Sequence, residues 1–387
     1  MEPADRLKVL PPYLFVEIDR KKREAMDAGR DVIDFGVGDP ERPTPDFIIG
    51  AADAALRKPA HHRYPLGIGM SEFRASVARF FEKRYGVKPD EKREVVALIG
   101  SKEGLGHLTL AIVNPGDFTL IPDPAYPVYL SGTYFAGGRP HFMPLREEND
   151  FLPDLDAIPE EVARRSSMMF LNYPNNPTGA IATRAFFERA VAFAREHDIL
   201  LVQDAAYCET FYADPPPSIL QIRGANDVAV ELHSLSKTFN MTGWRVGFAV
   251  GNAAALTALA KIKANFDSGV FGVVQEAAIA ALEGSERPEL RASREMYRQR
   301  CEVMAEGLRS FGLRVKEPAA TFYVWAGLPE GLDSMAAATR LLEQADVVCV
   351  PGIGFGESGE GFIRFAMTVD LDRVKEALRR LEKVNWK

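Results

Sequence analysis

Short runs of apolar residues alternate along the middle of the chain with helical stretches and with turns rich in Gly, Pro or Asn. The apolar runs fall at 95–99, 118–121, 168–171, 199–202 and 228–232. Each run is nearly continuous rather than alternating, which is typical of strands that are buried on both faces of a sheet. Strands that alternate with helices predict an α/β fold with a mainly parallel, doubly wound sheet.

The pattern changes after residue 285. A long helical segment at 289–311 precedes an aromatic strand at 322–325, and helix and strand then alternate up to a closing helix near 374–384. A chain of 387 residues is too long for one ordinary core. We therefore expect a large domain over 46–285 and a smaller α/β domain over 1–45 and 286–387. A helix at 12–22 is a candidate lid.

Composition excludes several classes of protein. The formal net charge is −7 and no basic stripe is visible, which disfavours nucleic-acid binding. Cys208, Cys301 and Cys349 are far apart and odd in number, so they do not indicate a disulfide framework. No apolar run approaches the roughly 20 residues that span a bilayer, and no leader is visible. These features predict a cytoplasmic protein with no membrane partner.

Polar residues follow the apolar runs at several separate places. Gly100-Ser101-Lys102 follows the first run, Asp204 follows the fourth and Ser234 follows the fifth. Because ligands of open α/β sheets bind outside the carboxyl ends of the strands, these residues are expected to converge on one site.

The stretch from Ser234 to Gly247 is the most informative. Lys237 follows a strand amid hydroxyls and glycines, and a partly desolvated lysine can condense with an aldehyde. Ser234, Ser236 and Arg245 are donors suited to a phosphate. A lone Ser-x-Ser-Lys is as often a solvated surface turn, but the spacing of Arg245 between two glycines favours a functional site.

This stretch resembles the lysine signature of the fold-type I aminotransferases of classes I and II, which depend on pyridoxal 5'-phosphate (PLP). The resemblance extends from Phe35-Gly36-Val37-Gly38-Asp39-Pro40 to Arg364. It implies the PLP-dependent transferase fold type I. It also implies that Lys237 links covalently to the cofactor and later moves the substrate proton. Ser234, Ser236 and Arg245 would hold the phosphate.

The same resemblance assigns further residues around the cofactor. Ser101 and Lys102 would complete the phosphate cradle at the start of a helix. Asp204 would keep the pyridine nitrogen protonated, and Tyr207 would donate a hydrogen bond to the phenolic oxygen. Tyr126 would stack on the ring. Singly, an Asp after a strand is as often a helix cap.

Substrate residues and a subunit partner are also implied. Asn176, in Asn175-Asn176-Pro177-Thr178-Gly179, would contact both the cofactor and the substrate. Arg364 would bind the substrate α-carboxylate, which a guanidinium holds with two hydrogen bonds, and Gly38 would approach the same group. Tyr64 would reach the phosphate of a neighbouring subunit. The resemblance therefore implies a homodimer with active sites at the subunit interface, and no metal.

The local sequence of several stretches, such as residues 98–104, 173–179 and 352–357, is similar to that of the LL-diaminopimelate aminotransferases. That subgroup transfers an amino group from glutamate to tetrahydrodipicolinate in lysine biosynthesis. The loop from Tyr64 to Gly69 departs from the subgroup's form, so alanine, aspartate or aromatic aminotransferases stay open. A PLP β-lyase or decarboxylase would use the same residues. A regulator with an aminotransferase-like domain is disfavoured, because no helix-turn-helix precedes residue 35.

Overall fold

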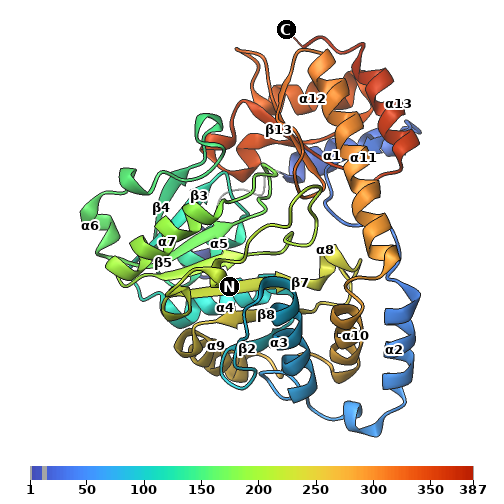
Figure 1. Cartoon of the computed structure of the whole chain (residues 1–387). Coiled ribbons are helices and arrows are strands. Elements are labelled where there is room, and N and C mark those ends of the chain that lie inside the picture. The colour runs from blue at the N-terminus through green and yellow to red at the C-terminus, as the bar shows by residue number, and fades with distance from the viewer. Residues whose placement is uncertain (1, 11–14, 387) are drawn as a thin grey trace.

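The computed structural model describes residues 2–10 and 15–386, and its centre is a seven-stranded sheet in the order β2-β8-β7-β6-β5-β3-β4 (Figure 1). The strands are β2 (Val95–Leu98), β3 (Phe118–Asp123), β4 (Arg139–Pro144), β5 (Ser166–Asn172), β6 (Leu200–Asp204), β7 (Ala229–Ser234) and β8 (Gly247–Gly251). From β7 to β4 every neighbouring pair is parallel, whereas β8 is antiparallel to both β2 and β7. The predicted mainly parallel sheet is confirmed, with β8 as an antiparallel insertion.

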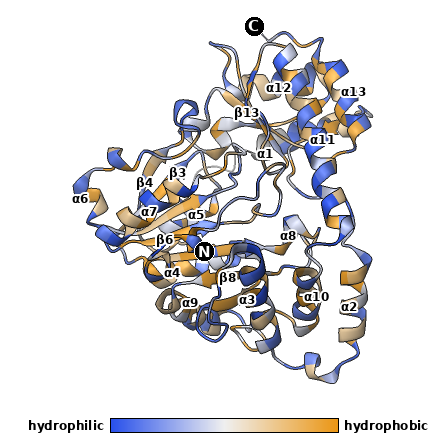
Figure 2. Cartoon of the chain, viewed as in Figure 1, coloured by the Kyte–Doolittle hydropathy of each residue, from blue (hydrophilic) through white to orange (hydrophobic). Residues whose placement is uncertain are grey.

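Helices cover both faces of this sheet. They are α2 (Asp46–Leu56), α3 (Ser71–Tyr85), α4 (Ser101–Ile112), α5 (Val128–Phe135), α6 (Glu160–Ala163), α7 (Arg184–Glu196), α8 (Leu235–Thr238), α9 (Ala253–Phe266) and α10 (Gly272–Glu283). Strand residues are hydrophobic and outward helix faces are hydrophilic, as Figure 2 shows. Leu201 packs in the cluster on one face and Val202 in the cluster on the other, because successive strand side chains point to opposite sides.

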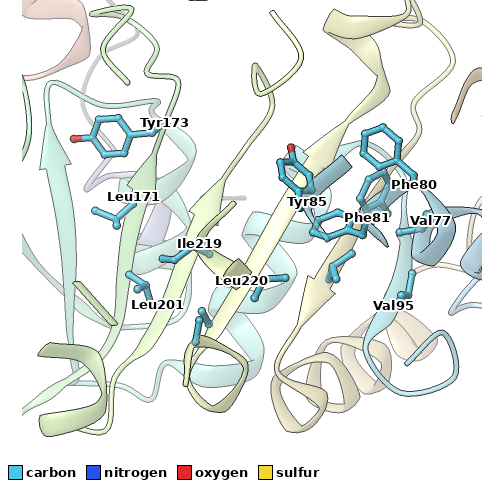
Figure 3. Packing of buried hydrophobic residues seen from close by; sticks show 14 of the residues in the cluster. Val77, Phe80, Phe81, Tyr85, Val95, Leu171, Tyr173, Leu201, Ile219 and Leu220 are labelled. Atoms are coloured by element: carbon cyan, nitrogen blue, oxygen red, sulfur yellow. The ribbon is translucent and has the colours of Figure 1, made fainter. Parts of the chain in front are cut away.

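Aromatic side chains fill much of one of these clusters. Phe80, Phe81 and Tyr85 of α3 gather beside the strands (Figure 3). The rings of Phe81 and Phe248 meet edge to face at 6.2 Å. Helix α3 ends at Gly86, whose φ of 68° suits a residue without a β-carbon.

A smaller region contains a four-stranded sheet in the order β12-β13-β10-β9. Its elements are α11 (Pro288–Ser310), β9 (Arg314–Val315), β10 (Tyr323–Gly327), α12 (Ser334–Ala345), β11 (Val347–Val348), β12 (Val350–Pro351), β13 (Phe362–Ala366) and α13 (Leu371–Leu381). The expected long helix, aromatic strand and closing helix correspond to α11, β10 and α13. Cys301 and Cys349 lie buried here, and they and Cys208 are free thiols.

The N-terminal segment packs on this smaller region. Strand β1 (Ile33–Asp34) pairs in parallel with β11, and Ile33 and Phe35 belong to the smaller region's core. The domain limits 46–285 and 286–387 stay a prediction, since Leu290 at the start of α11 packs in the larger core.

Residues 12–14 of the candidate lid lie outside the described residues. Helix α1 (Phe15–Asp27) follows them, and its Asp19 lines the large pocket described below. None of the helices within residues 2–10 and 15–386 combines the length and the hydrophobicity needed to cross a membrane.

Candidate active site

A pocket of about 1330 Å³ opens where the parallel strands end. Asp123, Asn172, Asp204 and Ser234 close β3, β5, β6 and β7, and all four line this pocket. The pocket is also lined from the smaller region by Arg364 and other residues, so it lies between the two sheets. It brings together nearly all of the residues that the sequence singled out, as expected for the carboxyl edge of an open α/β sheet.

Lys237 lies in the short helix α8, directly after β7. The Ser234 side chain caps this turn by accepting a hydrogen bond from the Ser236 amide at 3.2 Å. Lys237 Nζ donates to the Gly38 carbonyl at 2.6 Å. Burial lowers the pKa of Lys237 to about 8, helped by Arg364 and Arg245 and opposed by Asp39. The lowered pKa increases the fraction of neutral, nucleophilic amine near neutral pH.

Asp204 is buried at the end of β6. Its Oδ2 accepts a hydrogen bond from the Tyr129 hydroxyl at 2.8 Å, and its Oδ1 accepts one from the Ala206 amide at 3.2 Å. Burial raises the pKa of Asp204 to about 6, while these hydrogen bonds and the charge of His233 act in the opposite direction. A carboxylate held in this way is ready to pair with a cation that enters the pocket. The sequence did not single out Tyr129, which is fully buried in α5.

Tyr207 and Tyr323 meet through their hydroxyl groups, 2.8 Å apart. The sequence placed Tyr323 only in an aromatic strand, although a polar hydroxyl in such a buried run is a signal for a hydrogen-bonded role. A β-carbon on Gly38 would lie 2.2 Å from the Tyr323 hydroxyl. Gly38 is therefore required for the close approach of its loop to Tyr323.

Arg364 lies in β13 with its guanidinium between two aromatic rings. The centroid of Tyr323 is 4.3 Å away and that of Phe355 is 4.8 Å away. Nη1 donates to Asn176 Oδ1 at 2.7 Å, and Nη2 donates to the Gly36 carbonyl at 2.9 Å. Because Asn176 Oδ1 accepts from Arg364, the amide NH₂ of Asn176 is the group left to donate. Arg364 and Asn176 are thus placed side by side, as the sequence predicted.

A cradle of donors lies at the start of α4. Gly100, with φ of 74°, precedes Ser101, and a β-carbon on Gly100 would lie 2.3 Å from Arg245 Nη2. A β-carbon on Gly247 would lie 2.4 Å from the His233 carbonyl and 3.1 Å from the Ser101 amide. Gly100 therefore lets the guanidinium approach the helix N-terminus, and Gly247 lets β8 pack closely against the end of β7 and the start of α4. The helix amides, this guanidinium and the serine hydroxyls that line the pocket are donors of the kind that hold an anion.

Tyr126 lines the same pocket beside this cradle. Lys102 Nζ lies 5.7 Å from the centroid of its ring, and Tyr129 meets the ring edge to face at 6.0 Å. The stacking role of Tyr126 stays a prediction.

Tyr64 lies apart from the pocket of its own chain and is 92% exposed. Leu66, Phe266 and Phe271 are further exposed apolar side chains, and Gly269 packs closely against the Leu66 carbonyl. The loop that carries Tyr64 and Leu66 and the segment between α9 and α10 therefore lie against each other, and both carry exposed apolar side chains. Such a surface is compatible with the predicted contact to a second subunit.

Comparisons with known proteins agree with this geometry. The family "Aminotransferase class I and II" matches residues 30–381. An LL-diaminopimelate aminotransferase of Syntrophobacter fumaroxidans is 54% identical over 99% of both chains, and one of Aquifex aeolicus is 52% identical over 98% of both.

A solved structure of a probable N-succinyldiaminopimelate aminotransferase from Thermus thermophilus has a TM-score of 0.91 and 40% identity. The match covers 95% of this chain and 99% of that one. The family match spans most of this chain, and the relatives match nearly all of it. The chain therefore belongs to the class I and II aminotransferases and is a transaminase.

Proposed function

We propose that this protein is a PLP-dependent aminotransferase that passes an amino group from glutamate to a keto acid, with tetrahydrodipicolinate as the acceptor. One observation carries the cofactor assignment: Lys237, Asp204, Tyr207, Asn176 and Arg245 line a single pocket. The chemical groups that line the pocket fit PLP. Lys237 offers an amine of lowered pKa, Asp204 a buried carboxylate, and the Gly100–Arg245 contact a cradle for phosphate.

When bound, PLP supplies an electron sink for negative charge at the substrate α-carbon. Lys237 Nζ would hold the cofactor covalently and then carry the proton from the substrate α-carbon. Asp204 would keep a proton on the ring nitrogen. The Tyr207 hydroxyl and the Asn176 amide would donate hydrogen bonds to the phenolic oxygen.

Arg364 would bind and orient the α-carboxylate. Its guanidinium is planar, charged and held between Tyr323 and Phe355, and its Nε is buried without a hydrogen-bond partner among the described residues. Two parallel hydrogen bonds from such a group fix the position of a carboxylate. Orientation by Arg364 would bring the substrate α-carbon within reach of Lys237.

The substrate proposal rests on the relatives. The curated proteins quoted above are LL-diaminopimelate aminotransferases at 52% and 54% identity. More distant structures include a Thermus thermophilus aspartate aminotransferase at 29% identity with a TM-score of 0.93, so the same fold also serves other amino acids. We further propose a homodimer in which Tyr64 reaches the partner's phosphate site. Its exposure supports this assignment.

An absorbance scan of the purified protein tests the cofactor and the half-reaction. We expect a band near about 420 nm that moves to about 330 nm when glutamate is added, because the bound cofactor carries the chemistry. The keto acid that restores the first band identifies the acceptor. A protein that shows no band after PLP is added would contradict the proposal.

A second assay separates the substrate candidates. LL-diaminopimelate with 2-oxoglutarate is expected to exceed alanine, aspartate and phenylalanine in kcat/KM by at least about 100-fold. Equal values for these amino acids would remove the diaminopimelate assignment and leave the aminotransferase. A β-lyase would instead release ammonia and a keto acid continuously from one amino acid, with no added keto acid.

A further inference from the structure

Three polar side chains, Cys208, His233 and Glu231, form a chain in the core behind the pocket. His233 Nδ1 lies 3.2 Å from Cys208 Sγ, and His233 Nε2 lies 2.7 Å from Glu231 Oε1. Glu231 Oε2 accepts hydrogen bonds from the Ser218 hydroxyl at 2.6 Å and from the Ile219 amide at 3.0 Å. The side chains of His233 and Glu231 are only 4% and 2% exposed. None of these three residues, Cys208, His233 and Glu231, lines the pocket.

The contacts of His233 with Cys208 and Glu231 favour its protonated form. Burial alone would lower its pKa, but the contacts with Cys208 and Glu231 outweigh burial and raise the pKa of His233 to about 10. A protonated His233 donates from both ring nitrogens, to the Glu231 carboxylate and to the Cys208 sulfur.

A buried ion pair of this kind is costly. Replacement of buried ion pairs by apolar residues is often neutral or stabilising in proteins, so stability alone is a weak reason for this one. Groups with perturbed pKa values cluster at functional sites, which directs attention to the neighbouring pocket.

Two connections join the Cys208–His233–Glu231 chain to the active site. His233 directly precedes Ser234, which caps the turn that carries Lys237. Cys208 directly follows Tyr207, and its amide donates to the carbonyl of Ala205, the residue after Asp204, at 3.1 Å. Strand pairing sets Asp204 opposite Leu232, the residue between Glu231 and His233. The Cys208–His233–Glu231 chain therefore contacts both the segment after Asp204 and the segment that carries Lys237.

The surroundings of His233 leave its charge unshielded by water. Phe81 of α3 lies 5.1 Å from the imidazole ring, and Phe248 of β8 stacks on it at 4.8 Å. The ring of Tyr85 lies 6.4 Å away. Besides Glu231 and Cys208, the titratable groups near it are Tyr85, Asp204 and Glu209, and Glu209 is itself paired with Arg84 at 2.9 Å. In this apolar setting a charge acts over several ångströms.

We propose that the Cys208–His233–Glu231 chain positions Asp204 and Tyr207 for the cofactor. Glu231 holds the His233 imidazole, which anchors the turn after Asp204 through Cys208. The three are positioning residues, because none of them lines the pocket. The inference rests on the proposed function, in which Asp204 pairs with the ring nitrogen of PLP.

The test compares His233→Gln and Cys208→Ala with the parent holoenzyme. A control variant is Ser166→Ala, which removes a buried hydrogen bond to the Val162 carbonyl at the amino end of β5, away from the pocket. Three quantities are measured: the dissociation constant of PLP, the pH midpoint of the change in its visible band, and the thermal unfolding midpoint. Only the first two report on Asp204.

The expected changes in the PLP dissociation constant and the pH midpoint follow from loss of the His233 charge. Without it the pKa of Asp204 rises, so the carboxylate is protonated at higher pH and holds the ring nitrogen less well. In His233→Gln we expect the PLP dissociation constant to increase about tenfold and the pH midpoint to move up by about one unit. Cys208→Ala should shift both in the same direction by less. Ser166→Ala should change the unfolding midpoint alone.

Parent values of both cofactor quantities in His233→Gln and Cys208→Ala would overturn the inference, even if their unfolding midpoints fall as in Ser166→Ala. If His233→Gln does not fold, Cys208→Ala decides in the same way: shifted cofactor quantities support the inference and unshifted ones overturn it. A parent protein that binds no PLP would instead overturn the proposed function, before any variant is compared.

Discussion

Two aspartates in this molecule illustrate two uses of a carboxylate. Asp31 is exposed and receives hydrogen bonds from Arg373 at 2.6 and 2.9 Å and from Arg380 at 2.6 Å. These arginines hold the pKa of Asp31 well below its ordinary value. Asp204 is buried, accepts from the neutral donors Tyr129 and Ala206, and has its pKa raised to about 6.

The difference teaches how a functional carboxylate is recognised. Asp31 ties the segment before β1 to α13 and already has its cationic partners. Among the described residues, no lysine or arginine forms an ion pair with Asp204. A buried carboxylate that is hydrogen-bonded but has no direct counter-ion is suited to bind a cation. The pocket beside Asp204 gives such a cation access.

Lys237→Ala should give the largest effect, because it removes the amine from the pocket and leaves both aspartates intact. We expect transamination to fall by at least about 10⁴-fold, since the covalent link and the proton carrier are lost together. Single-turnover absorbance with glutamate measures this, and PLP should still bind non-covalently. Near-normal turnover in the variant would show that Lys237 is not the reactive amine.

Asp204→Asn and Asp31→Asn each remove the charge of one of the two carboxylates. Asp204→Asn should lower kcat about 10²- to 10³-fold, because a developing charge loses its preorganised partner. Asp31→Asn should leave kcat unchanged and lower only the unfolding midpoint. Steady-state kinetics and thermal unfolding of both variants check this pair. A fast Asp204→Asn enzyme would remove Asp204 from the chemistry.

The pH dependence of stability should have opposite signs at the two sites. The raised pKa of Asp204 means that the folded apoprotein binds more protons than the unfolded chain between about pH 4 and 6, so stability from this group falls as pH rises through that window. The lowered pKa of Asp31 gives a contribution that is fully present above about pH 4 and is lost only as pH falls further.

Unfolding midpoints of the cofactor-free parent and of each variant, measured from about pH 4 to 7, check these signs. The parent should lose stability relative to Asp204→Asn as pH rises. The difference between the parent and Asp31→Asn should stay constant above about pH 5. A constant difference for both variants would mean that burial does not shift Asp204.

Tyr323→Phe should give the smallest effect. It removes one hydroxyl, which contacts the Tyr207 hydroxyl at 2.8 Å, and leaves the ring over Arg364 in place. Loss of one hydrogen bond of about 1 kcal/mol predicts a fall of about fivefold in kcat/KM. An unchanged kcat/KM would show that Tyr207 is oriented without Tyr323.

Much of the pocket could be predicted from the sequence because its polar residues follow apolar strands directly. Asp204 and Ser234 end β6 and β7, so local pattern and strand polarity place them at one edge. The antiparallel direction of β8 could not be predicted this way, because strand pairing depends on contacts that are distant in sequence. Tyr129 and Cys208 were missed as partners for the same reason. Their roles depend on which side chains face them across the core.

The position of β13 has a consequence for synthesis. Arg364 lies on this strand between β10 and β12, and in the chain it comes after every other pocket residue discussed above. As the polypeptide emerges from the ribosome, the lysine, the aspartate and the phosphate cradle can therefore meet before the arginine is available. Completion of the pocket then coincides with completion of the smaller region.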